Sequence, residues 1–197
     1  MTALPLILRV VETAGHAVFT TGELNLNLVG VRSPTQVSDQ FDDRLHAVWR
    51  DFRGEWVERS WRITTDPGAY YLQHPMRSDG TAILAPGQYR GAYIVGRHKG
   101  YPALQQDRPV MVFRDGNADA HLDYTKLQPA PASSRINIHA ADLDPFDSTD
   151  RERAGVGRWS AGCQVFARAD DYRQFWKLVE RSAARFGPRF TYTLVHA

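Results

Sequence analysis

Short apolar runs separated by turn residues occupy the first two thirds of the chain. Residues 24–31 alternate leucine and valine with asparagine, which is the two-residue period of a half-buried strand. Turn signals occur at residues 65–68, 86–87 and 115–117, where glycine or proline stands beside aspartate or another polar residue. We therefore expect extended segments at residues 6–11, 24–31, 45–52, 55–64, 82–84, 89–95, 109–114 and 135–139.

One long helix is predicted near the C-terminal end, at residues 170–186. Asp170 is a suitable N-cap and Gly187-Pro188 a clear stop. Residues 190–195, rich in aromatic and β-branched side chains, predict a terminal strand. The expected fold is one α+β domain over residues 1–197, mostly β, with the helix packed on the sheet. The helix's apolar face comprises Tyr172, Phe175, Trp176, Val179, Ala183 and Phe186.

The composition narrows the classes of function. The 197 residues are 43% hydrophobic and 23% charged, with a formal net charge of +2 and no run of basic residues, so we expect no nucleic-acid partner. A single cysteine precludes an internal disulfide and a cysteine-rich zinc site. We also expect no membrane span and no signal peptide, because no apolar stretch is long enough and no basic segment precedes residues 4–8.

Cys163 is the first candidate for chemistry. It follows Ser160-Ala161-Gly162, a run of small residues that lets the backbone turn tightly and approach a ligand. A cysteine after such a turn can attack a carbonyl while nearby N–H groups stabilise the oxyanion. The alternative is an inert, buried cysteine, as most free cysteines are.

His139 is the candidate base. It ends the predicted strand at residues 135–139 and precedes a turn-rich segment that leads to Cys163. A histidine in this position can activate a thiol, although it can also be a structural residue held by hydrogen bonds. The other six histidines have no comparable context: His16, His46, His74, His98, His121 and His196.

These motifs resemble the L,D-transpeptidase (YkuD-type) catalytic domain. Asn137-Ile138-His139 precedes Ser160-x-Gly162-Cys163, with 24 positions between histidine and cysteine, somewhat more than is usual in the family. The turn at residues 64–68 and Pro-Gly-x-aromatic at 86–89 also resemble it, so the likeness covers about residues 55–170. Ala161 replaces the family's second histidine, and Gln164 stands where the family often has a small apolar residue.

The resemblance implies a mixed β-sheet or sandwich fold and an enzyme that needs no cofactor. Cys163 would attack a peptidoglycan stem peptide between an L-centre and a D-centre, and His139 would move the proton. The N–H groups of Gly162 and Cys163 would form the oxyanion hole, and the Ala140 carbonyl would orient the imidazole. Further residues are expected to bind substrate: Ser160, Trp159, Gln164 and Tyr89.

Such an enzyme would act in the periplasm or cell wall. With no signal peptide visible, we expect another export route, phage lysis or a trimmed chain. Two other functions stay open at the level of sequence. One is a metal-dependent hydrolase built on His139 and nearby acids, and the other is a wall-binding module whose active site has decayed. The acids that follow His139 are Asp142, Asp144, Asp147 and Asp150.

Overall fold

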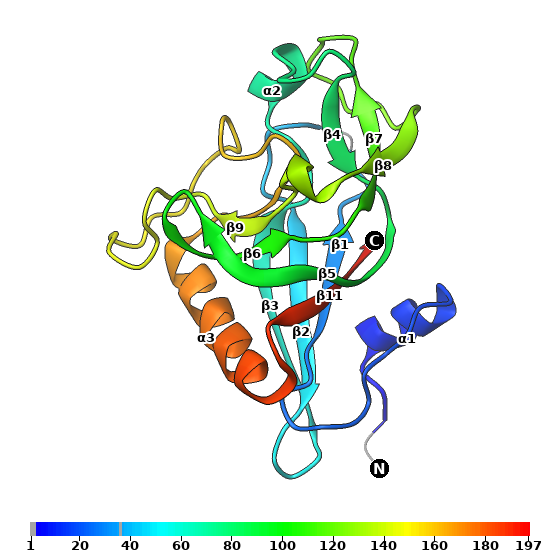
Figure 1. Ribbon diagram of the computed structural model, residues 1–197, viewed down its shortest axis with the longest axis vertical. Coiled ribbons are helices and arrows are strands. Elements are labelled where there is room, and N and C mark those ends of the chain that lie inside the picture. The colour runs from blue at the N-terminus through cyan, green and yellow to red at the C-terminus, as the bar shows by residue number, and fades with distance from the viewer. Residues whose placement is uncertain (1–2, 36) are drawn as a thin grey trace.

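The computed structural model describes residues 3–35 and 37–197 (Figure 1). Among these residues, eight strands close into a barrel and three form a separate small sheet. In order around the barrel the strands are β1 (Asn27–Arg32), β11 (Arg189–His196), β5 (Gly87–His98), β6 (Tyr101–Gln106), β9 (Ile138–Ala140), β10 (Gln164–Phe166), β3 (Trp56–Thr64) and β2 (Asp43–Arg50). The small sheet has the order β4 (Thr81–Leu84), β7 (Val110–Asp115) and β8 (Leu127–Ala130).

The predicted class is confirmed: the chain is α+β and mostly sheet, with a helix and then a strand at its C-terminal end. The expectation of a sandwich is wrong, because β1 pairs with β2 on one side and with β11 on the other, and the sheet closes. The sheet is mixed, since β1–β11 and β9–β10 are parallel and the other barrel pairs are antiparallel. Closure leaves the barrel without a free edge.

Helix α3 (Ala169–Phe186) packs most of its predicted apolar face on the barrel, but Phe186, predicted to belong to that face, is exposed. Phe175 lies 5.8 Å from Trp61 and 4.9 Å from Phe166, measured between ring centroids. The helix begins one residue earlier than predicted, with Arg168 at the N-cap position, and Asp170 pairs with Arg173 instead of capping. At the other end the predicted stop is confirmed, because the chain leaves the helix at Gly187.

Helix α1 (Leu6–Thr13) occupies the first apolar run, which we expected to be extended. Leu8 and Val11, three residues apart, are buried against Val29 and Val195 on the outside of the barrel. Packing of one helical face outweighs the strand propensity of the branched residues in this segment. The short helix α2 (Ala69–Gln73) and the 3-10 helix η1 (Ala132–Ser134) complete the described elements.

The small sheet and α2 lie beyond one end of the barrel, as Figure 1 shows. The turn that carries the candidate nucleophile Cys163 comprises residues 160–163 and is called the nucleophile turn. It lies at this junction, because a Cβ on Gly162 would be 2.4 Å from the carbonyl oxygen of Ala82 on β4. In the part of the chain described here, no helix is long and apolar enough to cross a membrane.

Candidate functional site

Cys163 and His139 lie on the same outer face of the barrel. β10 begins directly after Cys163 and runs parallel to β9, with Gln164 opposite Ile138 and Val165 opposite His139. Side chains alternate along a strand, and Gln164 and Ile138 are fully buried inside the barrel. The thiol and the imidazole therefore project outward from neighbouring strands, although they are 24 positions apart in the sequence.

The Cys163 thiol is held by the backbone just before β9. The Asn137 N–H donates to Sγ over 3.4 Å, and the thiol donates to the Arg135 carbonyl oxygen over 3.3 Å. The surroundings are largely apolar, and desolvation raises the pKa of Cys163 to about 11. The resting group at neutral pH is thus a thiol, which needs a base when it attacks.

His139 has a fixed orientation and one free nitrogen. Its Nδ1 lies 2.9 Å from the Ala140 carbonyl oxygen, which also accepts a hydrogen bond from the Tyr101 hydroxyl at 3.0 Å. Because a carbonyl only accepts, Nδ1 carries the proton and the lone pair is on Nε2. Nε2 is buried and has no hydrogen-bond partner among the described residues. Burial lowers the pKa of His139 to about 3, so the ring is neutral at pH 7.

His98 stacks on His139, a contact that sequence reasoning missed. The rings are 3.8 Å apart between centroids and 8° from parallel. The Nδ1 of His98 lies 3.3 Å from the side-chain nitrogen of Asn137, whose Oδ1 accepts from the Gln106 N–H at 3.0 Å. Burial lowers the pKa of His98 to about 4, so this ring is also neutral at pH 7. A second imidazole, at the end of β5, therefore packs flat against the candidate base.

Ser160 is buried and organises the nucleophile turn instead of facing substrate, which corrects its predicted role. Its hydroxyl donates to the Cys163 carbonyl oxygen at 2.9 Å and accepts the Gly162 N–H at 3.2 Å. The Ser160 carbonyl in turn accepts the Gly68 N–H at 2.9 Å. The turn at residues 65–68 thus contacts the nucleophile turn directly.

The N–H groups of this turn differ in availability. The Gly162 N–H, predicted as an oxyanion donor, already donates to Ser160. Within the described residues, the Cys163 N–H has no hydrogen-bond acceptor. Cys163 itself therefore supplies the free N–H beside the thiol.

No residue with a side chain fits at position 162. Its φ is +117°, and a Cβ there would collide with the Ala82 carbonyl oxygen. We expect Gly162→Ala to destabilise the fold by about 3 kcal/mol or more, since backbone strain and a steric clash add. Gly157→Ala is the matched control in the same loop, with φ +51° but nothing within 4 Å, and should cost about 1 kcal/mol. Urea unfolding measures both free energies, and an equal loss of stability in Gly162→Ala and Gly157→Ala would contradict this account.

Two predicted substrate contacts are wrong. Gln164 is fully buried, and its Oε1 accepts the Tyr192 hydroxyl at 3.0 Å inside the barrel. Tyr89 is 8% exposed, and its hydroxyl donates to the carbonyl oxygens of Ala85 and Met111, at 2.5 and 3.1 Å. Trp159 is partly buried, and the Arg153 guanidinium lies 5.2 Å from its ring centroid. Trp159 therefore packs against the outer apolar cluster and stays partly exposed.

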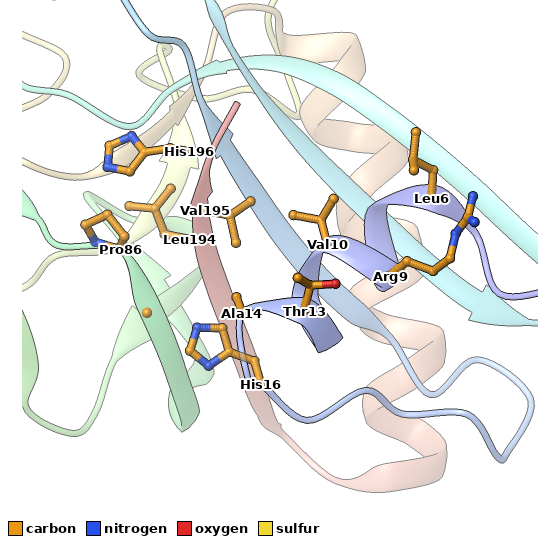
Figure 2. A pocket seen from close by; sticks show the side chains of 11 residues that line it. Leu6, Arg9, Val10, Thr13, Ala14, His16, Pro86, Leu194, Val195 and His196 are labelled. Atoms are coloured by element: carbon orange, nitrogen blue, oxygen red, sulfur yellow. The ribbon is translucent and has the colours of Figure 1, made fainter.

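A groove of about 280 Å³ adjoins the nucleophile turn. Its walls come from η1, from the turn and from the small sheet, and include Ser134, Ile136, Ala161, Ala82 and Arg114. A larger hollow of about 750 Å³ lies elsewhere, between α1 and the end of β11 (Figure 2). That hollow is mostly apolar, and none of its lining residues belongs to the turn or to the groove, so size alone does not identify the site.

The acids after His139 do not form a metal site. Asp142 binds Arg153 at 3.3 Å, and Asp150 pairs with Arg168. In residues 3–35 and 37–197, no group of three or more histidine, cysteine or acidic side chains is arranged to hold a metal ion. The metal-dependent hydrolase therefore has no ligand set in this part of the chain.

Comparisons with known proteins do not assign a family. The chain matches no protein-family model, and comparisons with curated proteins and with solved structures find no significant match. The resemblance to L,D-transpeptidases therefore depends on the residues of this chain alone.

Proposed function

We propose that this protein is a cysteine-dependent enzyme that acts on peptidoglycan stem peptides, in the manner of an L,D-transpeptidase of the YkuD type. One observation supports it most: His139 is neutral, fixed at Nδ1 by Ala140, and keeps a buried, unpartnered Nε2 on the face that carries Cys163. An inert cysteine needs no such base. The site of action would be the periplasm or the cell wall.

The proposed reaction has two steps. Sγ of Cys163 attacks the carbonyl of the L-residue while Nε2 of His139 takes the thiol proton. The Cys163 N–H stabilises the oxyanion. The tetrahedral intermediate collapses, the C–N bond breaks, and His139 returns the proton to the departing amine of the D-residue. The thioester then passes to an acceptor amine or to water, and Cys163 regains its proton.

His98 has the role of a positioning residue, because it touches His139 and not the reacting atoms. We expect His98→Ala to lower kcat about 10- to 100-fold with little change in KM, since a small misplacement of the base is costly. It should also shift the acid limb of the kcat/KM profile toward higher pH, because solvent entry moves the pKa of His139 back toward its ordinary value.

His98→Phe is the matched control, because it keeps a flat ring on His139. It should retain most of the activity and the wild-type pH profile. Unchanged kcat and unchanged pH dependence in His98→Ala would show that the stack has no part in the reaction.

Mass spectrometry of muropeptides tests the proposed function. New cross-links would indicate transpeptidation, and shortened stems or opened cross-links would indicate hydrolysis. Iodoacetamide should stop the reaction and EDTA should not. Binding to sacculi without any change in the muropeptides would instead identify a wall-binding module, and inhibition by EDTA alone would identify a metal-dependent hydrolase.

A further inference from the structure

The groove beside the nucleophile turn holds a buried guanidinium. Arg114 on β7 pairs with Ala82 on the edge strand β4, and the Ala82 carbonyl oxygen faces Gly162. One strand, β4, therefore separates Arg114 from the turn, and β7 runs about 4.8 Å from β4 between backbones. Its side chain lines the groove and is only 5% exposed.

The charge of Arg114 is only partly matched. Nη1 donates to the Gly80 carbonyl oxygen at 3.2 Å, while Nε has no hydrogen-bond partner and lies 3.8 Å from Oδ2 of Asp79. Asp79 is already held by Arg77 at 2.8 and 3.2 Å and by Gln128 at 2.8 Å. Two guanidiniums thus share one carboxylate, which leaves one net positive charge at this end of the groove.

A second polar group in the groove also lacks a partner. The hydroxyl oxygen of Ser134 is buried and unpaired within the described residues, and Ser134 lines the same cavity as Arg114. Burying unpaired polar groups costs free energy unless a ligand satisfies them. A guanidinium and a hydroxyl that line one cavity suit a carboxylate, which can accept from both.

We infer that this groove is a carboxylate subsite and that it takes the free α-carboxylate of the D-residue whose amine is released. The inference rests on the proposed function and names the part of the substrate that the site selects. That carboxylate lies one residue from the scissile carbonyl, about 3.5 Å along the chain, and Ala161 of the turn lines the same groove as Arg114. The groove volume of about 280 Å³ holds roughly nine liquid waters, enough for one small residue.

Matched peptides test the inference on the wild-type protein. A stem tetrapeptide with a free C-terminal carboxylate should acylate Cys163 about 10- to 100-fold faster than its C-terminal amide, since one charge-assisted hydrogen bond is lost. In a third peptide the C-terminal carboxylate is free and the carboxylate of the second residue is replaced by an amide. This peptide should acylate Cys163 as fast as the unmodified tetrapeptide. Equal rates for the acid and its C-terminal amide, or discrimination only at the second position, would overturn the subsite.

Variants locate the effect. Arg114→Gln should lower the rate for the free acid about 10- to 100-fold and remove the preference over the amide. Arg44→Gln, at an exposed position on β2 outside the groove, should change neither. Ser134→Ala is a milder change and should weaken the preference for the free acid in part. It tests the subsite if Arg114→Gln fails to fold. Retention of the full preference in Arg114→Gln would contradict the inference.

Calorimetric titration separates this inference from the proposed function. Tighter binding of the acid than of the amide, with no acylation of either, would refute the enzyme and keep the subsite. Acylation by both peptides at the same rate and with the same affinity would keep the enzyme and refute the subsite.

Discussion

Cys163→Ala will lose the muropeptide-converting activity, with a fall in rate of about four orders of magnitude or more. The reason is that the thioester cannot form, and no other cysteine exists in the chain to replace it. His139 and the Cys163 N–H would remain, but neither can form the covalent intermediate. The initial rate with a stem tetrapeptide, followed by mass spectrometry, measures the loss.

The control for Cys163→Ala is its folding stability, which should stay close to that of the wild-type protein. Cys163 is partly exposed and contributes one small side chain to an outer cluster, so alanine should cost about 1 kcal/mol or less. Cys163→Ser keeps the size but has a much weaker nucleophile, and it should be nearly as inactive. Full activity in either folded variant would remove Cys163 from the reaction.

His139→Gln should lower kcat by about 10²- to 10⁴-fold and leave KM nearly unchanged, because general-base catalysis contributes that much and the side chain does not bind substrate. Glutamine can keep a hydrogen bond to the Ala140 carbonyl, which limits the disturbance to the fold. Wild-type kcat in this variant would show that Cys163 is activated in another way.

His139→Gln should also differ from the wild-type protein in how its free energy of unfolding changes as the pH falls. Burial lowers the pKa of His139 from 6.5 to about 3, so the unfolded chain binds this proton first as the pH falls. The histidine's contribution is complete above pH 6.5 and is lost between there and about pH 3, with roughly 2 kcal/mol lost at pH 5. His139→Gln should lack this loss.

Comparison of the two proteins is necessary because Asp66 acts in the opposite direction. Burial raises its pKa from 3.8 to about 7, so its contribution to stability falls as the pH rises through that interval. Both proteins share Asp66, and the difference between their unfolding free energies at pH 7.5 and pH 5 isolates His139. An unchanged difference would contradict a buried neutral imidazole.

The sequence predicts strands best where a segment is long and is paired along its whole length. β2 and β3 pair along their whole length and follow the predicted runs closely. β8 and β10 are too short, and β6 too mixed in polarity, for periodicity to show. The run at residues 6–11 fails for a different reason: it packs outside the barrel, where three-residue spacing against the strands decides the structure.

Some residues of the candidate site could be predicted from the sequence and others could not. The candidate nucleophile and base, Cys163 and His139, follow from local motifs, and the structure brings them to one face. Gln164 could have been placed from the alternation of side chains, since a residue next to an outward cysteine must point inward. His98 and Arg114 could not, because their contacts depend on the register of the β5–β6 and β4–β7 pairs, which no local pattern specifies.

Intact-mass analysis of the protein with a stem tetrapeptide tests the central claim most directly. The account predicts a transient gain equal to the mass of the peptide minus the mass of the released D-amino acid. Proteolytic digestion should place this gain on the fragment that contains Cys163. The adduct should be labile to hydroxylamine, as a thioester is. Turnover of the peptide without this adduct, or an adduct on another residue, would contradict the account.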